Sequence, residues 1–121
     1  MTETFSSIST ISLPEITFIG GTYKELPFDV VDDLGNPVDL TSFTFSWVLS
    51  PFGKPEITTL AKTGVLDTTV VTNNRFIVYL YSYDTINLSG KYMHQPIITG
   101  TPGYEFRNGQ GYIIIISGLS T

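Results

Sequence analysis

A polar corner between two strand-like runs restricts the fold of this 121-residue chain more than any other feature. Residues 75–81 and 91–98 are both rich in β-branched and aromatic side chains, which favour strands. The nine residues between them, 82–90, are mostly polar and end in Gly90. This order predicts a chain that leaves one β-sheet, turns, and enters a second sheet.

Each residue type in the corner has an expected structural role. Asp84 and Thr85 can accept hydrogen bonds from backbone N–H groups, Leu88 can close the base of the core, and Gly90 can allow a tight bend. Tyr92 can bond back to the corner backbone, as the tyrosine near the start of the equivalent strand does in immunoglobulin-like sandwiches.

The rest of the chain reads as short strands separated by turn residues. Residues 43–49 alternate most clearly, with Trp47 on the apolar side. Pro27 cannot donate to a ladder, so its strand is expected at an edge or with a break there. Two weaker strands are predicted at 57–62 and 65–72, separated by a turn.

No segment shows convincing helical periodicity. The sequence therefore predicts an all-β fold, an immunoglobulin-like antiparallel β-sandwich of about seven to nine strands. The last strand, residues 111–117, contains a continuous isoleucine run. Such a run indicates burial on both faces, or one face covered by a partner.

The length predicts one domain, with an N-terminal arm at residues 1–14 and the sandwich at 15–121. The arm is rich in Ser and Thr and carries four isolated apolar residues, Phe5, Ile8, Ile11 and Leu13. It is either a disordered tail or a segment that docks on its own or a neighbouring subunit.

Composition argues against several classes of function. The net charge is −5 and the six basic residues are scattered, so we expect no nucleic-acid partner. The chain has no cysteine, which excludes disulfides and thiolate metal sites. It shows no secretory signal and no apolar run long enough to span a bilayer, so we expect no membrane partner.

The sequence offers no convincing catalytic or cofactor-binding pattern, and we expect a protein that is not an enzyme and holds no cofactor or metal. The lone His94 has no second histidine to share a metal with and is better interpreted as a partly buried, hydrogen-bonded residue. The acidic cluster of Asp32, Asp33 and Asp39 with Asn36 lacks the spacing of a calcium loop and fits turn capping.

Candidate contact residues are mostly aromatic. Tyr79 and Tyr81 alternate with an apolar face that is expected to be core, so they would lie on the outer surface of their sheet. Phe52 lies in a predicted loop. With Tyr104 and Phe106, it raises the alternative of a module that binds sugars or a receptor.

Eight short segments and one histidine share an order and spacing along roughly residues 20–117. They are residues 21–23, 27–30, 35–41, 45–47, 76–80, 84–85, 88–92, His94 and 110–115. In that order they resemble the immunoglobulin-like domain of bacteriophage virion structural proteins, including the N-terminal domain of baseplate upper proteins.

The resemblance implies a non-enzymatic structural protein located in the virion in multiple copies, with other virion proteins as partners. A capsid-associated auxiliary or decoration subunit is the first expectation. A neck, tail or baseplate component, or a module that binds host-surface carbohydrate or a receptor, is the alternative.

Overall fold

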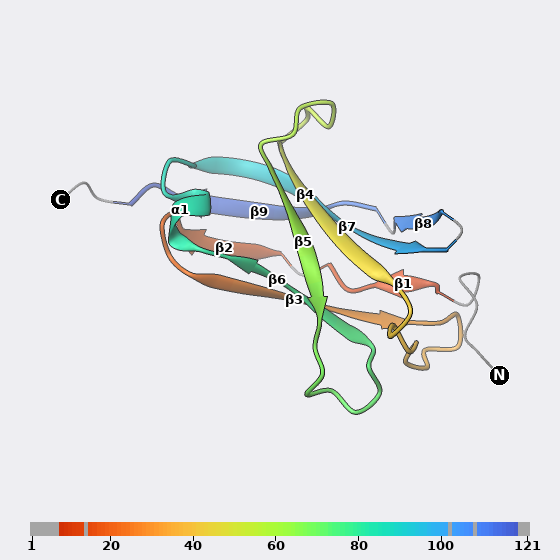
Figure 1. The fold of residues 1–121 in the computed structure, drawn as a ribbon. Helices are drawn as coiled ribbons and strands as arrows, with labels where there is room; N and C mark the ends of the chain where they lie inside the picture. Colours follow the sequence, from red (N-terminus) through yellow and green to blue (C-terminus); the bar gives the residue numbers. More distant parts are fainter. Residues whose placement is uncertain (1–7, 14, 102, 108, 119–121) are drawn as a thin grey trace.

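The computed structural model describes residues 8–13, 15–101, 103–107 and 109–118. These residues form nine strands and one short helix, and the strands are arranged in two layers (Figure 1). The elements are β1 Thr10–Ile11, β2 Ile16–Ile19, β3 Lys24–Val31, β4 Thr44–Pro51, β5 Leu60–Leu66, β6 Arg75–Leu80, α1 Ser82–Thr85, β7 Gly90–Gly100, β8 Tyr104–Arg107 and β9 Gly111–Ile116.

The strands follow one hydrogen-bonded path, β1-β3-β6-β5-β4-β7-β9-β2, which curls over so that its two halves face each other. β8 lies off this path and pairs with β7. The first half supplies the layer of β1, β3 and β6, and the second half supplies the layer of β4, β7, β9 and β2. This arrangement is an immunoglobulin-like sandwich, so the predicted fold class is confirmed.

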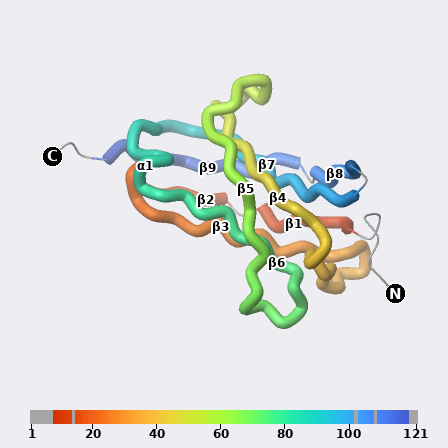
Figure 2. Tube along the Cα trace, in the orientation of Figure 1, coloured from red at the N-terminus to blue at the C-terminus, as the bar shows by residue number. Residues whose placement is uncertain are grey.

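The N-terminal segment contributes to both layers. β1 pairs with β3 antiparallel, whereas β2 pairs with β9 parallel, with Ile16 opposite Ile113 and Ile19 opposite Ile116. Figure 2 shows β2, from the red end of the sequence, beside β9, from the blue end. The sandwich is therefore antiparallel except at this one described pair, which closes the second layer.

β5 connects the two layers, and it differs from the sequence prediction. Two strands separated by a turn at Thr63 and Gly64 were expected, but one continuous strand runs through both residues. Its first part pairs with β4 and its last two residues pair with β6. A Cβ atom at Gly64 would lie 2.8 Å from Cβ of Phe45 and 2.9 Å from Cδ2 of Phe76. Gly64 is thus required because the Phe45 and Phe76 side chains lie close to its backbone, and not because the chain turns there.

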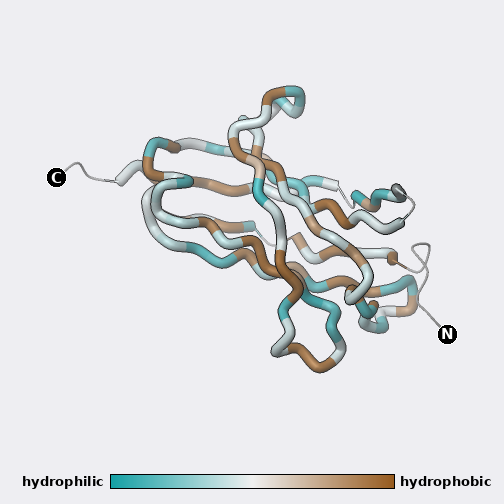
Figure 3. Tube along the Cα trace, viewed as in Figure 1, coloured by the Kyte–Doolittle hydropathy of each residue, from teal (hydrophilic) through white to brown (hydrophobic). Residues whose placement is uncertain are grey.

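The core forms where apolar side chains of both layers meet. Phe76 of β6 stacks on Phe45 of β4 at 4.5 Å and on Phe28 of β3 at 5.2 Å between ring centroids. Trp47 is fully buried beside them. Figure 3 shows apolar stretches along the strands of both layers, and also at the tip of the β5–β6 loop.

β3 lies between β1 and β6 and is not an edge strand, but β1 pairs only with Val30 and Val31, so among the described residues no strand pairs with the β1 side of β3 at Pro27. The N–H of Val30 donates to the carbonyl of Asn74 on the β6 side, whereas the N–H of Asp29 donates to Oγ of Ser12 on the opposite side. Alternation along β3 places residue 27 on the same side as residue 29. The missing N–H of Pro27 therefore costs the β3–β6 ladder no hydrogen bond.

Candidate functional site

The polar corner contains a one-turn helix that the sequence analysis did not predict, α1. The N–H of Tyr81 donates to Oδ2 of Asp84 at 2.8 Å, and the same oxygen pairs with Nζ of Lys62 at 2.9 Å. The buried hydroxyl of Thr85 accepts the N–H of Gly21 at 2.9 Å. Asp84 and Thr85 thus accept backbone hydrogen bonds in the way expected for them.

The remaining corner residues complete the turn into β7. Leu88 is half-buried and packs against the core, and Gly90 has a φ of 111°, which favours glycine. The hydroxyl of Tyr92 donates to the carbonyl of Ser89 at 3.0 Å, which is the bond expected of a tyrosine corner. The polar atoms of Asp84, Thr85 and Tyr92 already form hydrogen bonds within the domain, so the corner is better interpreted as a structural element than as a ligand site.

His94 is more deeply buried than expected. It is 1% exposed, and its Nδ1 accepts the indole N–H of Trp47 at 2.9 Å. Burial lowers the pKa of His94 to about 4, so the ring is neutral near pH 7. Its Nε2 has no hydrogen-bond partner within the described chain. A Cβ at Gly111 would lie only 2.6 Å from that atom.

The acidic turn caps its own backbone. Oδ1 of Asp32 accepts the N–H groups of Leu34 and Asn36, and Oδ1 of Asp39 accepts from both N and Oγ1 of Thr41. Those bonds lower the pKa of Asp39. Among the described residues, no group of three or more potential ligand side chains is arranged to hold a metal ion.

Two of the predicted contact residues in the arm belong to the core instead. Ile8 and Ile11 are 5% and 1% exposed, because residues 8–11 lie against β3. They cannot contact a partner in this arrangement. Leu13 is half-buried against the same core, and Phe5 lies outside the described residues.

The described aromatic candidates for sugar binding do not share one environment. Phe52 follows β4 and is half-exposed, with its ring 5.6 Å from that of Tyr112. Tyr104 is exposed at the start of β8, whereas Phe106 is half-buried against the core.

One outward surface, which we call the β9 face, is apolar. It comprises Ile19 of β2, Tyr112, Ile114 and Ile116 of β9, and Phe52 beside them. Ile19 lies opposite Ile116 in the pairing register, and these two side chains are 51% and 50% exposed. The isoleucine run is therefore not buried on both faces.

The β9 face carries little charge. β2 and β9 contain no charged residue. Nζ of Lys91 lies over the rings of Phe52 and Tyr112, at 4.2 and 4.9 Å from their centroids. This cation sits on aromatic faces at the margin of the surface and its stem adds to the apolar contact.

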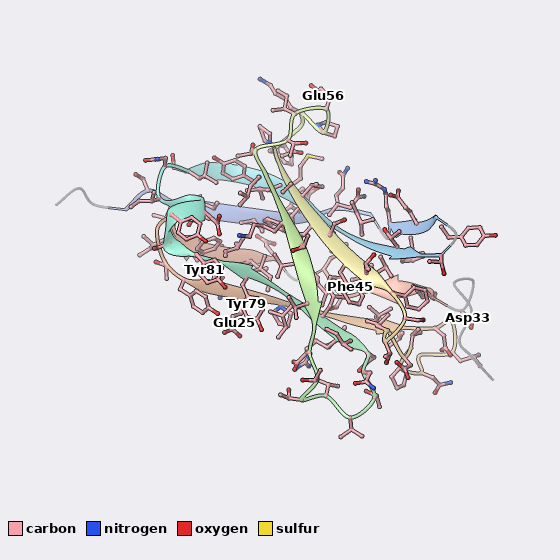
Figure 4. The ribbon with its side chains drawn as sticks, viewed as in Figure 1. Glu25, Asp33, Phe45, Glu56, Tyr79 and Tyr81 are labelled. Atoms are coloured by element: carbon pink, nitrogen blue, oxygen red, sulfur yellow. The ribbon has the colours of Figure 1, made fainter. Side chains whose placement is uncertain are left out.

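A second outward surface, the tyrosine cluster, lies at the opposite layer and comprises Tyr23, Tyr79, Tyr81 and Tyr83. Phe76, Val78 and Leu80 are buried, so Tyr79 and Tyr81 do point outward as predicted. Figure 4 labels Tyr79, Tyr81 and Glu25 on this side, with Tyr81 nearest to α1.

Sequence reasoning missed Tyr23 and Tyr83. The ring of Tyr81 lies 5.7 Å from that of Tyr23 and 5.6 Å from that of Tyr83. Tyr23 reaches Tyr81 because β3 pairs with β6, and Tyr83 reaches it because α1 turns the chain back. The alternation of residues 76–81 does not indicate that Tyr23 or Tyr83 lies beside Tyr81.

No family model matches this chain, and no curated protein matches it. Among solved structures, it is similar to a mutant of the SrpA adhesin from Streptococcus sanguinis, with a TM-score of 0.48 and 19% identity. The similarity covers 89% of this chain and 57% of that one. It is also similar to murine CRIg, with a TM-score of 0.41 and 9% identity over 91% of this chain and 98% of that one. No helix in the described residues has the length and hydropathy needed to cross a membrane.

Proposed function

We propose that this protein is a non-enzymatic structural subunit that binds other proteins of a large particle through the β9 face. The particle is a bacteriophage virion, with the capsid surface as the first position and the neck, tail or baseplate as the alternative.

The exposed apolar surface of β2 and β9 is the observation that carries this proposal. Ile19, Ile116 and Tyr112 are each about half-exposed on adjacent strands. Contiguous exposed apolar side chains mark interaction sites more often than free surfaces do. Only 14% of the residues of the whole chain are charged, which suits a protein whose surface is partly covered in an assembly.

The virion assignment is supported by the order of sequence segments that resemble phage immunoglobulin-like domains. The immunoglobulin-like fold is compatible with that resemblance. Because this fold occurs in proteins of many unrelated functions, the proposal rests on the sequence segments and the β9 face.

The test uses phage particles whose genome encodes this chain. Mass spectrometry of purified particles should find the protein in multiple copies. A double variant, Ile19→Asp with Ile116→Asp, places two carboxylates at paired positions of the β9 face, and we expect it to fold but to be lost from particles.

Val71→Asp is the matched control, because Val71 is an apolar residue of the β5–β6 loop that is 96% exposed. This variant should enter particles at the wild-type level. Normal incorporation of the double aspartate variant would show that the β9 face is not the contact surface. Absence of the wild-type protein from particles would reject the virion assignment itself.

A further inference from the structure

The tyrosine cluster differs from the β9 face because its rings stand among hydrogen-bonding groups. Tyr23, Tyr81 and Tyr83 are 49%, 43% and 73% exposed, and their rings form a continuous row. We propose that this row is a binding site for an uncharged pyranose sugar. The proposal does not depend on the β9 face or on the virion assignment.

The row is held in place by interactions on both sides. The backbone of Tyr81 is fixed by Asp84 at the start of α1, and Nζ of Lys62 lies 5.3 Å from the centre of its ring. The hydroxyl of Tyr23 donates to Oε2 of Glu25 at 2.9 Å. A site whose rings are already ordered loses less conformational entropy when a ligand binds.

The chemistry of the row fits a sugar better than a flat protein surface. A pyranose ring offers an apolar C–H face and a rim of hydroxyl groups, and here exposed aromatic rings lie beside polar acceptors. Oε1 of Glu25 accepts no hydrogen bond from the described residues. It is therefore available to a sugar hydroxyl while the rings of Tyr23 and Tyr83 contact the C–H face, since Lys62 lies over the ring of Tyr81 and Tyr83 stacks on it.

Local charge selects against acidic sugars. Lys62 is paired with Asp84 in a largely buried ion pair, so this cation is already neutralised. Glu25 forms no ion pair within the described residues. Desolvation and the hydrogen bond to Glu25 raise the pKa of Tyr23 to about 12, so its hydroxyl stays protonated. A carboxylate or sulfate on the ligand would meet the uncompensated charge of Glu25.

The experiment exposes the full chain to neutral and acidic carbohydrates on a glycan array and then in solution. Solution probes are cellotriose, maltotriose, mannotriose and chitotriose, with 3′-sialyllactose and a heparin tetrasaccharide as acidic comparisons. Saturation-transfer NMR and amide shift changes around α1 would report binding at millimolar sugar. We expect at least one neutral glycan on the array to bind, and the acidic probes to remain unbound.

Substitutions of single tyrosines test whether the sugar binds at the tyrosine row. Tyr83→Ala removes the most exposed ring and should weaken affinity about tenfold, as loss of an aromatic anchor does. Tyr83→Phe keeps the ring and should retain most of the affinity. Tyr104→Ala is the matched control, since Tyr104 is a 59% exposed tyrosine of β8. It should bind as the wild type does.

Three results would overturn the proposal. They are a blank array for neutral glycans, preferential binding of acidic glycans, and neutral-glycan binding that Tyr83→Ala leaves unchanged. If the tyrosine row instead binds a protein that carries no sugar, the array would show no binding of neutral glycans.

Discussion

Trp47 of β4 and His94 of β7 are joined by a buried hydrogen bond, with the indole Nε1–H donating to Nδ1 of the imidazole at 2.9 Å. The ring of His94 also lies 5.9 Å from that of Phe28 on β3. These three side chains bring together both layers of the sandwich. In antibody domains a disulfide between the layers packs on a tryptophan, and its second cysteine lies two residues after the corner tyrosine. Here that position, two residues after Tyr92, is His94.

The first prediction is that stability falls as the pH is lowered through the range in which unfolded histidine titrates. The unfolded chain takes up a proton near pH 6.5, whereas the folded chain does so only near the lowered pKa of about 4. Stability from this source is therefore complete above pH 6.5 and is lost as the pH falls toward 4. The total loss is about 3 kcal/mol, measured by urea unfolding at a series of pH values.

His94→Asn is the control for this dependence, because its side-chain oxygen can accept from Trp47 but does not titrate. We expect the variant to be less stable near neutrality and to show a smaller slope between pH 5 and pH 6.5. An unchanged slope in that window would assign the dependence to another group. Lower pH values are less informative because the unfolded chain then also takes up protons on carboxylates such as Asp39 and Asp67, whose pKa is lowered in the folded protein by hydrogen bonds.

The second prediction concerns the strand that crosses between layers. Gly64→Ala should destabilise the fold by about 1–3 kcal/mol, because the added methyl group would press on both Phe45 and Phe76. Thr63→Ala, at an exposed position of the same strand, should change stability much less. Equal effects of the two substitutions in thermal unfolding would contradict a packing role for Gly64.

The corner could be predicted from sequence where its interactions are local, but not in its contacts with Lys62 and Gly21. Tyr92 bonds to a residue three positions away, and Asp84 caps the start of its own helical turn. Residue types and short spacings carry that information. Clear alternation likewise identified the buried side of the strand containing Trp47.

Features that depend on distant pairing were not predictable in the same way. Thr63-Gly64 resembles a turn in sequence, and only contact with Phe45 and Phe76 explains a glycine within a strand. Tyr23 and Tyr81 are far apart in the chain and meet through the β3–β6 ladder. A single strand pattern does not show which other strand will lie beside it.

The third prediction concerns the N-terminal segment. Ile11→Ala should destabilise the sandwich by about 2–5 kcal/mol, because Ile11 is 1% exposed in the core. Thr10→Ala, next to it on the exposed side of β1, should have a small effect. If both variants unfold at the wild-type urea concentration, packing of Ile11 in the core does not contribute to the stability of the domain.

The fourth prediction concerns the bond between the corner and the β2–β3 turn. Thr85→Val keeps the shape of a fully buried side chain but removes the oxygen that accepts the N–H of Gly21. We expect a loss of about 1–3 kcal/mol, since the N–H is left without its partner. Thr85→Ser keeps the acceptor and loses only a methyl group, so it should cost less than Thr85→Val. Urea unfolding of the two variants separates the hydrogen bond from packing. If Thr85→Ser proved the more damaging change, packing of the methyl group against the base of the sandwich would be the larger contribution.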